Sequence, residues 1–141
     1  MPIRTSDAQW DGTLKDGKGR FWTGSGEVAG DFSFGTRFEE EHGTNPEELI
    51  GAALASCFSM ALAADLEQTG HPSTTVRTTA RVDLEKDGAG FTVKRIDLEV
   101  EVSVPDIDDD VFQGIASTTR DMCPISRAIA VPIGLEARRA A

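Results

Sequence analysis

The sequence is poor in cysteine, in histidine and in positive charge. Its 141 residues include two cysteines, two histidines and 14 lysines and arginines against 24 acidic residues, which gives a net charge of −10. Such an acidic chain repels phosphate backbones and anionic lipids, so we expect neither nucleic acid nor a membrane as a partner. The first ten residues lack the apolar core of a signal peptide, which predicts a cytoplasmic protein without a permanent disulfide.

Familiar catalytic and metal-binding motifs are also missing. The sequence has no GxSxG, HExxH, phosphate-loop or dinucleotide-binding motif. Two cysteines together with His42 and His71 could in principle bind zinc, but their spacing matches no compact zinc pattern. We therefore expect no metal and no resident cofactor. The length predicts a single domain, residues 1–141.

A long helix is predicted over residues 45–69. Asn45 can cap its first turn, Pro46 suits the first helical position, and Gly70 follows its end. Residues 49–64 carry no charge. That run is shorter than the roughly 20 apolar residues that a membrane span requires. A helix that is apolar on every side must instead be surrounded by protein.

Strands are predicted on both sides of this helix. The sequence predicts strands over residues 8–13, 19–25 and 31–34 and a polar loop over residues 35–44. Alternating patterns at 74–85 and 91–104, joined by the turn KDGAG, predict a hairpin that the central helix covers. A helix over 108–121, a short helical piece over 125–130 and a strand over 131–138 complete an α+β fold of order ββ(β)αββαβ.

One small domain holds little material to cover so apolar a helix. Leaving one face wet would cost several kcal/mol, at about 25 cal/mol per Å². A second copy of the chain could supply the cover. We therefore expect an intimate homodimer, with the N-terminal strands helping to cover the partner.

The two cysteines differ in setting. Cys57 lies within the apolar helix, where burial raises a thiol pKa, whereas Cys123 precedes Pro124 at a predicted helix start, which lowers it. A reactive Cys57 therefore needs a nearby cation. The candidates are Arg37, Arg77, Arg81, Arg120 and Arg127. Cysteine is also among the most buried residue types, so inert packing is the alternative for both cysteines.

Two motifs resemble those of the OsmC/Ohr family of thiol-dependent hydroperoxide reductases. NPEELIGAALASCFSMAL, 45–62, resembles the family's signature helix, and CPISRAI, 123–129, resembles the motif of its second cysteine. WDGTLKDGKG, TRFEEEHGTNPEE and DGAGF extend the resemblance over nearly the whole chain, towards the OsmC branch. The resemblance implies the OsmC-like fold, an intertwined homodimer with two active sites at the subunit interface.

The resemblance also implies roles. Cys57 matches the peroxidatic cysteine and Cys123 the resolving one, Arg37 matches the arginine beside the thiolate, and Glu47 matches its carboxylate partner. We expect Glu47 to hold Arg37 by a bidentate pair. Oxidation of Cys57 to a sulfenate would then be followed by a Cys57–Cys123 disulfide, which an external dithiol, such as a lipoyl group, reduces.

These observations lead to three hypotheses about the function. The first is a peroxidase for organic hydroperoxides, with Phe32, Phe34, Phe58 and Met60 contacting the carbon tail, although these residues could equally be plain core. The second is a non-catalytic dimeric binding or stress-response module on the same fold. The third is an Ohr-branch protein, in which Arg20 takes the place of Arg37.

Overall fold

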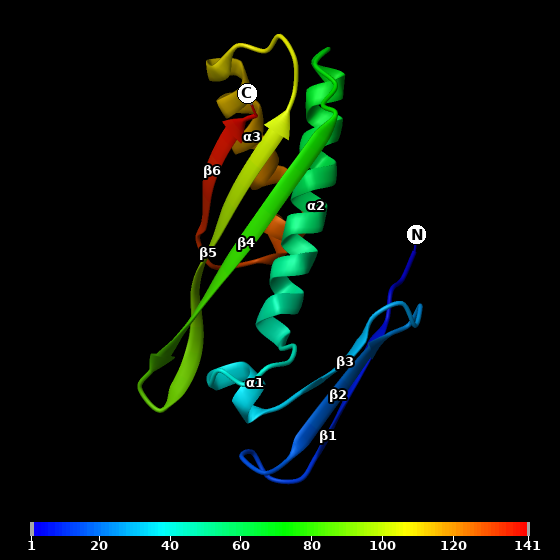
Figure 1. Ribbon diagram of the computed structural model, residues 1–141, viewed down its shortest axis with the longest axis vertical. Coiled ribbons are helices and arrows are strands. Elements are labelled where there is room, and N and C mark those ends of the chain that lie inside the picture. Colours follow the sequence, from blue (N-terminus) through cyan, green and yellow to red (C-terminus); the bar gives the residue numbers. More distant parts are fainter. Residues whose placement is uncertain (1, 141) are drawn as a thin grey trace. The chain divides into compact units, whose positions relative to one another are not determined.

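The computed structural model describes residues 2–140 and divides the chain into two compact units, Met1–Leu49 and Ile50–Ala141. The α+β composition agrees with the sequence prediction, while the single domain stays a prediction. The first unit holds β1 (Ser6–Asp11), β2 (Lys18–Thr23), β3 (Ala29–Phe32) and α1 (Phe34–Phe38). The long helix α2 (Pro46–Gln68) begins in this unit and continues through the second (Figure 1).

The three N-terminal strands form one antiparallel sheet in the order β1-β2-β3. Its aromatic side chains pack together, with the rings of Trp10 and Phe32 5.6 Å apart between centroids. Gly19 lies under these two rings, and a Cβ at this position would collide with both. The small residue therefore lets the rings lie over the strand.

Residues 34–38 form a helix that the sequence analysis missed by reading 35–44 as a loop. Ser33 caps it: its hydroxyl accepts from the Thr36 N–H at 3.2 Å, and the Thr36 hydroxyl accepts from the Ser33 N–H at 2.8 Å. This reciprocal pair is a capping box with threonine in the usual place of glutamate. It fixes the helix that carries Arg37.

Both ends of α2 lie within a residue of their predicted positions. Asn45 Oδ1 accepts from the Glu48 N–H at 2.8 Å, which confirms the predicted cap. At the other end the His71 N–H donates to Leu66 and the Gly70 N–H to Glu67, with Gly70 at φ +84°. These bonds form a Schellman motif, which requires the left-handed conformation that glycine adopts easily.

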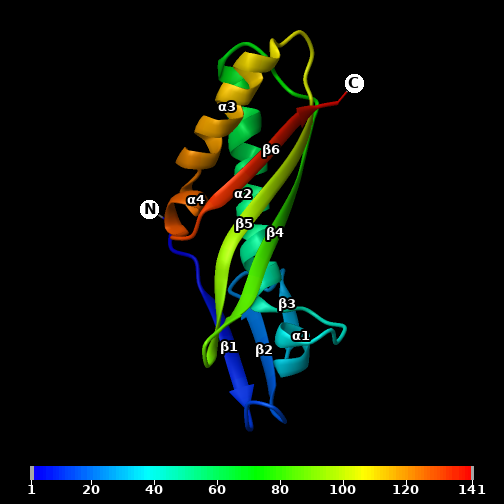
Figure 2. The same ribbon diagram turned by 90° about the vertical axis from the view of Figure 1, so that its left-hand side faces the viewer.

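The second unit is built on a sheet of order β4-β5-β6, with β4 (Thr75–Asp87), β5 (Gly90–Ser103) and β6 (Ile133–Arg139). β4 and β5 form the predicted hairpin, and β6 pairs with β5 in parallel (Figure 2). The parallel pairing needs a crossover, which α3 (Asp109–Met122) and α4 (Pro124–Ala128) supply. The two helices thereby bring Cys123 to the face of the sheet that α2 covers.

The core of the second unit lies between α2, α3 and one face of the sheet. The predicted inward residues of β5, from Ile96 to Val102, are buried, and Phe112 and Ala116 of α3 join them. Leu54, Phe58, Leu62 and Leu66 repeat every four residues along α2 and are fully buried. This spacing places one face of the helix against the sheet.

The other face of α2 remains open in this chain. Met60 is 78% exposed and Ile50 is also exposed. An open face agrees with the prediction that one chain holds too little material to surround this helix, and cover by a second copy stays a prediction. Among residues 2–140, α2 alone is long and apolar enough to cross a membrane by length and composition, a test that core helices of soluble proteins also pass.

Candidate redox site

The two cysteine sulfurs lie next to each other in the second unit. Cys57 Sγ on α2 and Cys123 Sγ at the end of α3 are 2.8 Å apart, although 66 positions separate them in the sequence. Both thiols are free. A disulfide has an S–S distance of about 2.05 Å, so only a small movement separates the thiol pair from a bond. The predicted proximity of the two sulfurs is confirmed.

Cys123 sits at the junction of two helices. Its N–H donates to the Thr119 carbonyl at 2.9 Å, which ends α3, and Pro124 then occupies the first position of α4. Proline suits that position because its missing N–H has no partner in a helix anyway. The prediction that Cys123 lies at a helix start is thereby confirmed, and the short helix covers 124–128 rather than 125–130.

The surroundings of the sulfurs shift their pKa values in opposite directions. Burial, and then the hydrogen bond with Cys123, raise the pKa of Cys57, while the backbone of Ile125 lowers it by a smaller amount. Burial alone would raise the pKa of Cys123, but hydrogen bonding with Cys57 and with Ser126 outweighs it and lowers that pKa. Because the two thiols are hydrogen-bonded to each other, the two pKa values belong to the pair.

The arginines of the second unit do not lower the pKa of Cys57. Arg77 and Arg81 lie at exposed positions of β4, and Arg127 is exposed on α4. Arg120 pairs with Asp121 at 3.0 Å. Three of the five candidate cations are thus exposed to solvent, and Arg120 is paired with a carboxylate. The fifth candidate, Arg37, belongs to the first unit.

Arg37 and Glu47 form an ion pair in the first unit. Arg37 Nε donates to Glu47 Oε1 at 2.8 Å, and the guanidinium lies 5.0 Å from the centre of the Phe38 ring. Glu47 is only 8% exposed, and its Oε2 has no hydrogen-bond partner among the described residues. The prediction of a bidentate pair is wrong, because only the Nε of Arg37 donates a hydrogen bond to the carboxylate. The two Nη groups of Arg37 make no hydrogen bond within residues 2–140.

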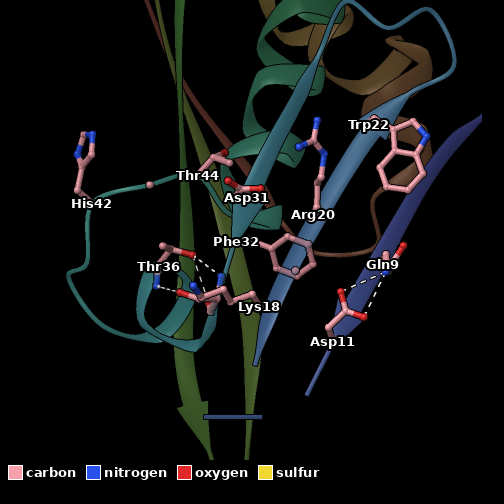
Figure 3. Close-up of a pocket in the computed structure, with 13 residues that line it drawn as sticks. Gln9, Asp11, Lys18, Arg20, Trp22, Asp31, Phe32, Thr36, His42 and Thr44 are labelled. Carbon is pink, nitrogen blue, oxygen red and sulfur yellow. Dashed lines mark hydrogen bonds between the residues drawn. The ribbon is translucent and has the colours of Figure 1, made fainter. Parts of the chain in front are cut away.

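Arg20, the alternative arginine, lies elsewhere in the first unit. It is on β2 beside Asp31 and Trp22, where these residues line a cavity of about 670 Å³ (Figure 3). Glu47 forms its ion pair with Arg37 and not with Arg20. The carboxylate pairing therefore follows the pattern that the resemblance implies for the OsmC branch.

The four proposed substrate contacts have different settings. Phe32 packs on Trp10 and lines the same cavity as Arg20, and Phe34 stacks edge-on against Phe38. Phe58 is fully buried in the core, as expected from the alternative that it is an ordinary core residue. Met60 is exposed on α2. Contact of these residues with substrate stays a prediction.

Ser126 is a site residue that the sequence analysis did not single out. It is 7% exposed, and together with Cys57 it lowers the pKa of Cys123. Its backbone lies in the first turn of α4, where N–H groups have no partner within the helix, and this place three residues after Cys123 is the signal that could have found it. Among residues 2–140, no group of three or more His, Cys, Asp or Glu side chains could hold a metal ion.

Comparison with known proteins gives a consistent result. Residues 39–136 match the family model described as OsmC-like protein. The chain is 46% identical over 134 residues to Peroxiredoxin OsmC of Escherichia coli, covering 94% of each chain. Its fold is similar to that of the organic hydroperoxide resistance protein OhrB of Bacillus subtilis, with a TM-score of 0.67, 22% identity and coverage of 96% and 98% of the two chains. An organic hydroperoxide resistance protein OsmC of Legionella pneumophila gives 0.69 at 20% identity, with both chains covered completely.

Proposed function

The chain belongs to the family of OsmC-like proteins, and from this we propose that it is a thiol-dependent peroxidase acting in oxidative and osmotic stress defence. It reduces organic hydroperoxides to alcohols, and hydrogen peroxide more slowly. The observation that carries the proposal is the 2.8 Å separation of the Cys57 and Cys123 sulfurs. The E. coli relative named a peroxiredoxin supports a peroxidase-type enzyme.

The chemistry proceeds in three steps. The Cys57 thiolate attacks the outer oxygen of the peroxide, the O–O bond breaks, and the alkoxide takes a proton and leaves as the alcohol. The Cys123 thiol then attacks the Cys57 sulfenic acid, forming the S–S bond and releasing water. An external dithiol reduces this disulfide by exchange and is itself oxidised to a disulfide.

Arg37 is proposed to activate Cys57. Burial and Cys123 both raise the pKa of Cys57, so the nucleophile needs a cation to ionise near neutral pH. Arg37 has two Nη groups without a described partner, while Glu47 holds its Nε. A guanidinium beside Cys57 would stabilise both the thiolate and the charge developing on the peroxide oxygens.

The reductant is proposed to be a dithiol, such as a lipoyl group on a carrier protein, and no resident cofactor or metal is required. The dithiol donates two electrons and the hydroperoxide accepts them, so the two cysteines suffice as the redox centre. The reaction is placed in the cytoplasm, where reducing conditions return the cysteines to the thiol state.

The active molecule is proposed to be a homodimer. The exposed face of α2, with Ile50 and Met60, is apolar and uncharged, and a second copy would bury it. Burial of such a surface is worth about 25 cal/mol per Å². In this arrangement the sites lie at the subunit interface.

The test compares single cysteine variants in a peroxide-consumption assay with dihydrolipoamide. Cys57→Ser should abolish consumption of cumene hydroperoxide. Cys123→Ser should allow a single turnover that stops at the sulfenic acid, which dimedone traps on Cys57. A Cys57→Ser protein that consumes the hydroperoxide at the wild-type rate would rule out the proposal.

One observation favours the second candidate, a non-catalytic binding module. The raised pKa of Cys57 is typical of a buried, inert thiol. Dimedone labelling separates the two functions, because a binding module should trap no sulfenate on Cys57 after treatment with peroxide.

A further inference from the structure

A hydrogen bond between α2 and α3 lies close to the cysteine pair. Thr119 Oγ1 donates to Asp65 Oδ2 at 2.5 Å and, within its own helix, to the Ile115 carbonyl at 2.9 Å, and the residue is only 1% exposed. Thr119 lies one turn before Cys123 on α3, and Asp65 lies two turns beyond Cys57 on α2. The bond therefore joins the same two helices that carry the two sulfurs.

Thr119 is also bonded directly to Cys123. Its carbonyl accepts from the Cys123 N–H at 2.9 Å. One residue thus holds the α2 carboxylate through its side chain and the resolving cysteine through its backbone. A change in the Asp65–Thr119 contact would therefore act on the last turn of α3, which ends at Cys123.

Asp65 is an unusual residue for packing alone. It ends an uncharged run of 16 residues, 49–64, and it is half-buried where the neighbouring positions are apolar. Burying a carboxylate is unfavourable unless it is hydrogen-bonded, and a bond to a charged acceptor is stronger than a neutral one. Among the described residues, Thr119 is the side-chain hydrogen-bond partner of this carboxylate. A leucine would pack against α3 without fixing its position along the helix axis.

We propose that Asp65 and Thr119 are positioning residues for disulfide formation, an inference that rests on the proposed peroxidase function. Their bond holds Cys123 Sγ within reach of Cys57 Sγ. In the step concerned, the Cys57 sulfenic acid and the Cys123 thiol form the S–S bond and release water. Such alignment acts through the effective concentration of one group at the other, and leaves the earlier reaction with peroxide unchanged.

The test substitutes the hydroxyl and follows the two steps separately. Thr119→Val keeps the shape and removes the donor, whereas Thr119→Ser keeps the hydroxyl. Thr118→Val is the matched control, since Thr118 is the exposed neighbour of Thr119. After a pulse of cumene hydroperoxide, dimedone trapping measures sulfenate formation, and loss of the Cys123 thiol measures disulfide closure.

We expect Thr119→Val to slow disulfide closure about tenfold, equivalent to roughly 1.4 kcal/mol, with sulfenate formation unchanged. Trapped sulfenate should rise accordingly. In Thr119→Ser and Thr118→Val the disulfide should close at the wild-type rate. Asp65→Asn keeps an acceptor oxygen, so its closure rate should lie between those of the wild type and Thr119→Val. Equal slowing of both steps, or equal rates in Thr119→Val and Thr118→Val, would overturn the inference.

A second measurement does not depend on peroxide. In a glutathione redox buffer, the Cys57–Cys123 disulfide equilibrium reports how well the two thiols are aligned. Thr119→Val should lower the oxidised fraction and Thr118→Val should not. If the wild type consumed no hydroperoxide but this difference remained, the positioning role would stand while the proposed function failed; no difference here would remove the positioning role.

Discussion

At the scale of single residues, the site is a thiol pair whose own surroundings disfavour ionisation of Cys57. Burial and Cys123 raise the pKa of Cys57, while Cys57 and Ser126 lower that of Cys123. The second unit alone therefore favours ionisation of Cys123 over that of Cys57. Peroxide chemistry at Cys57 depends on a cation that reverses this order.

The Cys123→Ala variant tests this coupling, because alanine can neither hydrogen-bond to Cys57 nor carry a charge. The hydrogen bond and the charge of Cys123 both raise the pKa of Cys57, so removing them should lower it. A lower pKa leaves a larger thiolate fraction at neutral pH, and alkylation of Cys57 should become faster there. The measurement is the pH dependence of iodoacetamide labelling of the Cys57 peptide by mass spectrometry. A midpoint that stays in place or moves upward would contradict the coupling.

The Arg37→Ala variant tests the activating cation. Loss of one preorganised donor at a developing charge slows catalysis by about 10²–10³, so sulfenate formation should fall by that order. Its pH midpoint should move upward, because the thiolate loses its counter-charge. Arg20→Ala is the control and should retain activity, since Arg20 lies beside Asp31 and not on Glu47. Retained activity in Arg37→Ala together with a loss in Arg20→Ala would favour the Ohr-branch reading.

The sequence identified the two cysteines and the Arg37–Glu47 pair through motif resemblance. It could not give the geometry of that pair, because the choice between one and two hydrogen bonds depends on how α1 presents the guanidinium. The Asp65–Thr119 bond was also missed. Asp65 interrupts an uncharged run and so carried a signal, but its partner is 54 positions away in the sequence.

At the scale of elements, periodic segments were predicted well and α1 was not. The hairpin β4–β5 alternates over many residues, so its inward face could be read directly. A helix of five residues is too short to show a period, and its capping box uses Thr36 rather than glutamate. Helix α1 could have been predicted only from Ser33 and Thr36 at capping-box spacing.

The Asn45→Ala variant tests the start of α2. Asn45 Oδ1 caps the Glu48 N–H, and its Nδ2 donates to the Thr36 carbonyl at 3.1 Å, joining α2 to α1. Loss of an N-cap costs about 1 kcal/mol, with a range of about 0.5–2. We expect a lower midpoint in urea unfolding followed by circular dichroism. Asn45→Asp, which keeps the capping oxygen, should be less destabilised, and equal loss in both variants would assign the effect to the Thr36 contact.

At the scale of the molecule, the open face of α2 is the feature that the single chain does not explain. The sequence predicted an apolar helix in need of cover, and the second unit covers one side only. Which residues of a second copy would cover the other side depends on shape and not on periodicity. No pattern within one chain carries that information.

The Met60→Glu variant tests the predicted homodimer. A carboxylate buried without a partner is strongly unfavourable, so this change should shift the dimer to monomer. Met122→Glu is the matched control, because Met122 is similarly exposed but lies on α3. Sedimentation velocity at micromolar concentration measures both. A wild-type monomer, or dissociation by Met122→Glu alone, would contradict the prediction that α2 forms the interface.

The long sequence separation of the two sulfurs, 66 positions, has a thermal consequence. A disulfide that closes a loop of this length restricts the unfolded chain, by an amount worth about 4 kcal/mol in the chain-entropy model. The oxidised molecule should therefore melt at a higher temperature than the reduced one. Calorimetric scans with and without reductant would then report the turnover state of the protein, and oxidant exposure itself would lengthen its lifetime in a heated cell.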